Sequence, residues 1–168
     1  LEISNQPAKS LYSFTREHHT VWYEFEAVHT GLLTFDLVPL NATNDYDFLL
    51  FKGTATELCE SIKNGLIKPL RTNISRFNPQ VNSKTGLALN AVAEFVHSGP
   101  GADYSKALPV KKGEYYLLVV DNVYKNGKGH TINFHYNDIV SENESKKEVV
   151  VVETELKNQP KKEVVVIN

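Results

Sequence analysis

Methionine is absent from this chain of 168 residues, and cysteine occurs only once, as Cys59. A single cysteine excludes a disulfide within the chain. The flanking glutamates disfavour a reactive thiolate, so we interpret Cys59 as a half-buried residue of a short helix. Because the chain starts at Leu1 and contains no methionine, we interpret it as a mature or excised piece from which an export signal was removed.

Strong charge of either sign is also missing, since the formal net charge is −2. This balance gives no general attraction to nucleic acid or to an anionic membrane surface. Long apolar runs are missing too, and the run from Val149 to Val152 is far shorter than the roughly 20 residues that span a bilayer. We therefore expect neither a nucleic-acid partner nor a membrane span.

Alternating apolar and polar residues indicate several strands, whereas helical periodicity is nearly absent. Short strands separated by turn-rich loops are typical of an all-β sandwich. The first two strands, joined through Gly31, are predicted to form a hairpin. Phe35 and Leu37 are predicted to face the core, together with Ile132, Phe134 and Tyr136. The predicted strands cover residues 21–27, 32–38, 47–52, 115–120 and 130–136.

One short helix is predicted, because Thr54 and Glu57 have the spacing of a capping box and Gly65 is a suitable stop. Residues 69–101 form a long insert that is rich in Asn, Ser, Gly and Pro and is predicted to be irregular. The composition changes again after Val140. We therefore divide the chain into a β-sandwich module, residues 1–140, and a charged, valine-rich tail, residues 141–168.

The tail contains the sequence Lys-Lys-Glu-Val-Val-Val twice, at residues 146–151 and 161–166. Charges that bracket apolar runs protect them from aggregation. One interpretation is a linker that leads into a further domain. The other is strand addition, in which a valine run pairs with an open sheet edge of this domain or of a partner.

Carboxylates gather at one end of two predicted strands. Asp45 and Asp47 begin one of them, whereas Asp121 and Asn122 end the other. If these strands are antiparallel neighbours, the four side chains meet at one edge of a sheet. Calcium takes six to eight oxygen ligands, so the pattern predicts a calcium site there. The alternative is that these residues cap local backbone amides in turns.

Patterns typical of catalysis are weak. The chain has no Gly-x-Ser-x-Gly and no helix-borne zinc-protease motif, and its histidines are scattered. The carboxylates of a glycosidase stand about 5–10 Å apart across a bound sugar, and a small sandwich offers no obvious cleft for them. We expect no enzymatic activity, with a small hydrolase that uses Asp45 or Asp47 as the weaker alternative.

Ligand contacts are predicted from exposed aromatic residues and from the polar insert. Trp22 is predicted to face away from Tyr23 and Phe25, which makes it the best candidate for an exposed ring. The alternative is that a second layer buries it. Arg71 and Arg76 lie in the insert and are predicted to contact a ligand.

Five segments occur in an order that resembles β-sandwich modules related to the bacterial pre-peptidase C-terminal domains. The resemblance extends to versions of these modules in secreted and cell-surface proteins of Bacteroidetes, including gliding and type IX secretion proteins. It covers roughly residues 15–137. The segments are 19–25 (HTVWYEF), 31–36 (GLLTFD), 44–48 (NDYDF), 112–122 (KGEYYLLVVDN) and 127–134 (GKGHTINF).

The resemblance implies a jelly-roll-like antiparallel sandwich in a secreted, periplasmic or cell-surface protein. It implies a non-catalytic binding or adhesion role toward a protein or polysaccharide ligand, with calcium held by Asp45, Asp47, Asp121 and Asn122. The alternative is a structural or assembly component of a secretion or gliding machine that binds protein partners. The long stretch between Gly53 and Ser105 departs from the shorter enzyme-linked modules of the family.

Overall fold

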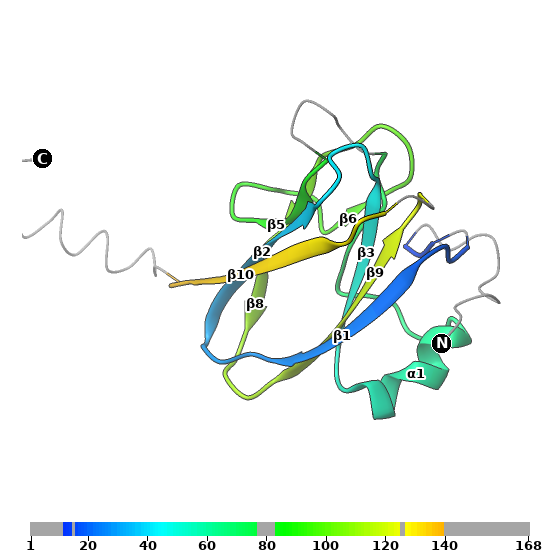
Figure 1. Ribbon diagram of the computed structural model, residues 1–168. Coiled ribbons are helices and arrows are strands. Elements are labelled where there is room, and N and C mark those ends of the chain that lie inside the picture. Colours follow the sequence, from blue (N-terminus) through cyan, green and yellow to red (C-terminus); the bar gives the residue numbers. More distant parts are fainter. Residues whose placement is uncertain (1–11, 15, 77–82, 125–126, 140–168) are drawn as a thin grey trace, which may run out of the picture. The chain divides into compact units, whose positions relative to one another are not determined.

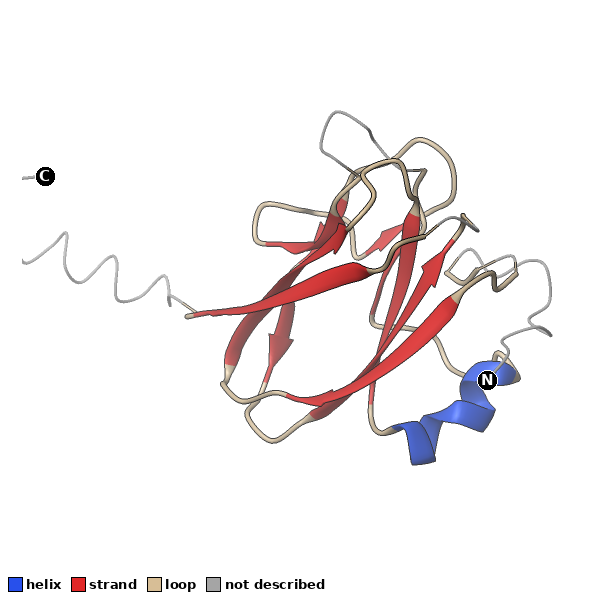
Figure 2. Cartoon of the chain, in the orientation of Figure 1, coloured by secondary structure: helices blue, strands red, loops and turns tan. Residues whose placement is uncertain are grey.

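The computed structural model describes residues 12–14, 16–76, 83–124 and 127–139. Two β-sheets pack face to face, and one helix lies outside them (Figures 1 and 2). The prediction of an all-β sandwich with one short helix is therefore confirmed. In the part of the chain that the structure covers, no helix is long and apolar enough to cross a membrane. The valine-rich repeats of the tail lie outside the described residues, so strand addition stays a prediction.

The sheets are mixed rather than purely antiparallel. Two strand pairs run parallel: β4 (Arg71–Asn73) with β6 (Phe95–Val96), and β5 (Thr85–Ala88) with β7 (Tyr104–Lys106). The insert that was predicted to be irregular supplies three of these four strands. Sheet A has the order β1 (Thr20–Glu26), β9 (Tyr115–Asn122), β3 (Tyr46–Lys52), β4 (Arg71–Asn73) and β6 (Phe95–Val96). Sheet B has the order β10 (His130–Asn137), β2 (Gly31–Pro39), β5 (Thr85–Ala88) and β7 (Tyr104–Lys106), and β8 (Leu108–Val110) also pairs with β2.

The hairpin predicted from the first two strands is wrong. β1 pairs with β9 in sheet A, whereas β2 pairs with β10 in sheet B, so the chain crosses between the layers at residues 27–30. Two backbone hydrogen bonds fix this crossing: Ala27 donates to Glu114 (2.9 Å) and accepts from Gly113 (2.9 Å). Alternation identifies the inward face of a strand but not its partner, because an apolar face fits either sheet.

The main core lies between the two sheets. Phe35 of β2 meets Phe48 of β3 edge to face, with ring centroids 5.1 Å apart. Burying each such side chain contributes about 2 kcal/mol to stability. The inward positions predicted from alternation are confirmed, since the core also includes or packs against Leu37, Ile132, Phe134, Tyr136, Tyr23 and Phe25.

A second apolar cluster covers the outer face of sheet A. Here Leu49 and Leu117 pack against Ile62 of the helix α1 (Ala55–Lys63) and against Phe14, which precedes β1. The predicted capping box starts the helix: the Thr54 hydroxyl accepts from the Glu57 amide, and the Glu57 carboxylate accepts from the Thr54 amide. Both faces of sheet A are therefore buried, whereas sheet B keeps an outer face that no helix covers in the described part of the chain.

Candidate functional site

The structure brings the carboxylates of β3 and β9 side by side. These strands are antiparallel neighbours, and Asp47 lies directly opposite Asp121 in their register. Both side chains are on the outer face of sheet A, because Phe48 and Val120 next to them point into the main core. Asp45 lies close enough to repel the charge of Asp47. The sequence therefore predicted the meeting of these carboxylates. A calcium site requires in addition that their oxygens are available as ligands.

The Asp121 carboxylate, which is 0% exposed, is already engaged by the segment before β1. Its Oδ1 accepts from the amides of His18 and His19, both at 2.9 Å, and from the Thr20 hydroxyl at 3.1 Å. Its Oδ2 lies 2.7 Å from Nδ1 of His18. Four donors directed at one carboxylate satisfy both oxygens. In this conformation Asp121 does not fit a calcium ligand.

The hydrogen bonds around His18 define its tautomer. Nε of Arg16 donates to Nε2 of His18 at 3.0 Å, so Nε2 carries no proton. The proton is on Nδ1, which therefore donates to Asp121. A relay from Arg16 through His18 to Asp121 thus ties the N-terminal segment to β9.

Asn122 does not join the three aspartates. Its side chain lies on the inner face of sheet A, where Nδ2 donates to the Tyr46 hydroxyl at 3.3 Å and Oδ1 accepts from the Tyr124 amide at 3.1 Å. Asn122 lines a hollow of about 350 Å³ together with Tyr23, His130 and other residues. Alternation along a strand separates Asn122 from Asp121 in this way.

The pKa of Asp47 is raised well above its ordinary value, first because burial disfavours its charge and then because Asp45 and Asp121 repel it. Within the described residues, no set of three or more His, Cys, Asp and Glu side chains is arranged to hold a metal ion. Calcium binding at this edge stays a prediction that Asp45 and Asp47 would have to carry.

We expect Asp47→Asn to stabilise the protein by about 1–2 kcal/mol at pH 7.5 in chelator. A carboxyl whose folded pKa is raised contributes stability at low pH, and this contribution is lost as the pH rises from the ordinary value of about 4 through the raised one. The advantage of the variant should therefore disappear near pH 4. Urea unfolding of both proteins at several pH values measures it.

The same pair of proteins tests the calcium prediction. A rise in Tm with calcium in the wild type that Asp47→Asn abolishes would support a calcium site, because a bound cation stabilises only the folded state. No rise would contradict it. If Asp47→Asn is less stable than the wild type in chelator at pH 7.5, the carboxylate is stabilised by a contact other than those described.

The three residues predicted to bind a ligand differ in their exposure to solvent. Trp22 faces away from Tyr23 and Phe25, as predicted, but it is half-buried against the outer cluster of sheet A. Arg71 is buried and donates to three backbone carbonyls. Arg76 is exposed. Arg76 and the open part of Trp22 are therefore accessible to a ligand, whereas Arg71 is not.

The outer face of sheet B carries a hollow that arises from small residues on its middle strand. Across the sheet, Tyr104 of β7 is opposite Gly86 of β5, Gly86 is opposite Asp36 of β2, and Asp36 is opposite Asn133 of β10. Gly86 has φ +145°, and a β-carbon there would overlap the Phe35 carbonyl oxygen, so only glycine fits. Because Gly86 has no side chain, Tyr104 reaches over it to Asp36.

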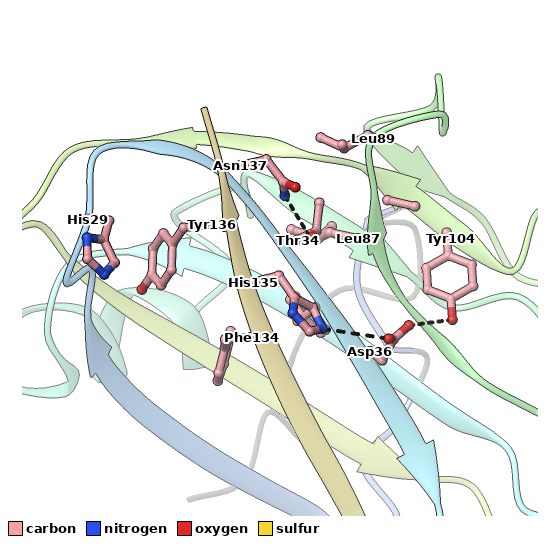
Figure 3. Close-up of a pocket in the computed structure, with 12 residues that line it drawn as sticks. His29, Thr34, Asp36, Leu87, Leu89, Tyr104, Phe134, His135, Tyr136 and Asn137 are labelled. Carbon is pink, nitrogen blue, oxygen red and sulfur yellow. Dashed lines mark hydrogen bonds and ion pairs between the residues drawn. The ribbon is translucent and has the colours of Figure 1, made fainter. Parts of the chain in front are cut away.

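This hollow has a volume of about 850 Å³ and is open to solvent; we call it the sheet B groove. The Tyr104 hydroxyl donates to Oδ1 of Asp36 at 2.7 Å, and Nε2 of His135 lies 4.0 Å from Oδ2 of the same carboxylate (Figure 3). Burial and then the bond to Asp36 raise the pKa of Tyr104, so the phenol stays protonated. The groove is lined by His29, Thr34, Phe35, Asp36, Leu87, Ala88, Leu89, Tyr104, Phe134, His135, Tyr136 and Asn137.

Sequence reasoning did not identify Asp36, Tyr104 or His135 as site residues. Alternation does predict that Asp36 and His135 face outward, because they alternate with Phe35 and Phe134. What the sequence does not contain is the pairing of β2 with β10 and the parallel approach of β7. The signal available was a polar residue at an outward strand position, as for Asp36 and His135.

Comparison with known proteins found no matching protein family, no similar curated protein and no similar solved structure. The resemblance to pre-peptidase C-terminal modules therefore stays a prediction, and the site must be argued from its own geometry.

Proposed function

We propose that this chain is a non-catalytic binding module of a secreted or cell-surface bacterial protein, and that its ligand occupies the sheet B groove. The observation that carries the proposal is the groove itself, a concave surface lined by a carboxylate that a hydrogen bond from Tyr104 holds in place. Ligand sites are usually preformed hollows of about 300–1,000 Å³ with a few well-placed polar groups. The bond from Tyr104 to Asp36 fixes both side chains before a ligand arrives.

The composition of the groove supports a binding role rather than catalysis. Its lining contains one acid, Asp36, and neither serine nor cysteine. Glycoside hydrolysis needs a second carboxylate, and nucleophilic catalysis needs an activated nucleophile. The Thr34 hydroxyl accepts a hydrogen bond from Asn137 at 3.3 Å. A groove of this composition is suited to hold a ligand unchanged.

We expect Ala88→Trp to weaken ligand binding by more than about tenfold, because a large ring would fill the floor of the groove. Ala88 is half-buried, and its neighbours in β5 fix its side chain on the outer face of sheet B. The measurement is binding of the purified chain to a glycan array and a peptide array, followed by titration of the best ligand.

Thr131→Trp is the matched control. Thr131 is exposed on β10 of the same sheet but does not line the groove, so the same ring should leave affinity within about twofold. If Thr131→Trp blocks binding and Ala88→Trp does not, the ligand binds elsewhere and the proposal is wrong. Absence of binding to both arrays would also count against it.

A further inference from the structure

We propose that the sheet B groove receives a basic side chain, lysine or arginine, from an extended segment of a partner protein. The inference rests on the proposed binding function and specifies its ligand. It is carried by the charge of the groove, by the geometry of Asp36 and by the apolar surface that leads to it.

Among the residues that line the groove, Asp36 is the only acid, and none is lysine or arginine. One cation lies beside it: Lys106 is exposed on β7, on the same face as Tyr104 and opposite Ala88. Asp103, next to Tyr104, adds a second negative charge that is close enough to disfavour ionisation of that phenol. Complementary charge steers a cation toward such a surface and favours it over a neutral or acidic ligand.

Asp36 has one oxygen available for a ligand. Oδ1 is taken by the Tyr104 hydroxyl, whereas Oδ2 makes no hydrogen bond to the described residues and faces His135 at 4.0 Å. The Asp36 side chain is 42% exposed, so a ligand can reach it from solvent. An ammonium or guanidinium group placed there would make a charge-assisted hydrogen bond to Oδ2.

The remaining walls suit the aliphatic part of a basic side chain. Ala88 and Leu89 line the groove together with Tyr104, and Leu89 is 56% exposed although it is large and apolar. Lysine and arginine carry methylene stems that pack on apolar surface while the charged end reaches a polar group. The Tyr104 ring adds an attraction for a cation near its face.

A neutral saccharide fits these features less well. A saccharide hydroxyl can donate to Oδ2 of Asp36, but it supplies no positive charge, so its hydrogen bond is weaker than one from an ammonium or guanidinium group. A small free amine would fill only part of a volume of about 850 Å³, whereas an extended peptide segment that carries a basic side chain fills more of it. The observations therefore favour a protein partner.

The test is an NMR titration of the ¹⁵N-labelled chain with the peptide acetyl-Gly-Lys-Gly-amide. We expect saturable shift changes at the amides of Asp36, Ala88, Tyr104 and His135. The same peptide with Nε-acetyl-lysine has no charge and should cause none. Binding should weaken severalfold when NaCl is raised from 20 to 500 mM, because salt screens an exposed ion pair.

Asp36→Asn removes the charge but keeps an oxygen that can accept from Tyr104, and it should weaken peptide binding by about tenfold. Glu26→Gln, on the exposed edge of sheet A, removes the same charge elsewhere and should have no effect. Should Asp36→Asn fail to give a folded spectrum, the salt dependence and the acetylated peptide decide the matter in the wild type.

Separate outcomes distinguish this inference from the proposed function. Groove shifts that persist in Asp36→Asn, or with acetyl-lysine, overturn the basic-side-chain inference. Shifts with cellobiose or N-acetylglucosamine but not with the lysine peptide also overturn it, while the groove remains a binding site. If no probe shifts the groove amides, the inference is wrong, and the array experiment with Ala88→Trp judges the binding function independently.

Discussion

Replacement of Asp121 by alanine is expected to lower the free energy of unfolding by about 3–4 kcal/mol and Tm by roughly 10 °C. The carboxylate is fully buried and accepts four hydrogen bonds. Alanine would leave the His18 and His19 amides and the Nδ1–H of His18 without their partner. Chemical unfolding followed by tryptophan fluorescence measures the loss.

The loss should be concentrated in the segment before β1. Phe14 belongs to the outer cluster of sheet A, and the Asp121 contacts hold the chain that connects Phe14 to β1. Hydrogen exchange should therefore rise first at residues 16–20 in Asp121→Ala, and trypsin should cleave sooner after Arg16. A variant that stays within about 1 kcal/mol of the wild type would contradict the structural role.

Asp121→Asn is the matched variant. Its single side-chain oxygen can still accept from the His18 and His19 amides and from Thr20, whereas the bond to Nδ1 of His18 is lost. We expect a smaller loss, of about 1–2 kcal/mol. Equal losses for asparagine and alanine would show that the charge, and not the three donors at Oδ1, dominates.

Much of the strand pattern was predictable from residues alone, and so was one long-range contact. Asp47 and Asp121 end up opposite each other because each lies at the acidic end of an apolar strand, and antiparallel pairing of two such strands brings the ends together. The chemistry of this edge was not predictable in the same way. The donors to Asp121 come from residues 101–103 positions earlier in the chain, and no local pattern marks them.

The groove shows a second limit of the sequence. Its shape depends on Gly86 of β5, which lies between Tyr104 of β7 and Asp36 of β2. Gly86 lies in residues 69–101 and Tyr104 just after them, where apolar and polar residues alternate only weakly. The sequence therefore did not predict which strands pair there. Tertiary pairing, rather than propensity, determined the site.

Arg71 offers the second large effect, because a residue predicted to bind a ligand is used to join the two sheets. It is 6% exposed and sits on β4 of sheet A. Its Nε donates to the Lys106 carbonyl (2.8 Å) and its Nη2 to the Ala107 carbonyl (3.1 Å), both at the junction of β7 and β8, while Nη1 donates to Leu70 (2.7 Å). Burial lowers the pKa of Arg71, and Glu94, 3.6 Å from Nη1, partly offsets this.

We expect Arg71→Ala to destabilise the protein by about 3 kcal/mol, since three carbonyls lose their donors and a buried volume is emptied. Arg71→Lys keeps the charge but not the planar guanidinium, and should cost about 1–2 kcal/mol of stability.

Arg76→Ala is the control. The Arg76 side chain is exposed and its amide still donates to Gly99, so the stability of this variant should change by less than about 0.5 kcal/mol. Urea unfolding of the three variants measures these differences. If Arg71→Ala unfolds like the wild type and loses only ligand binding, the guanidinium serves a ligand and its carbonyl contacts are incidental to the fold.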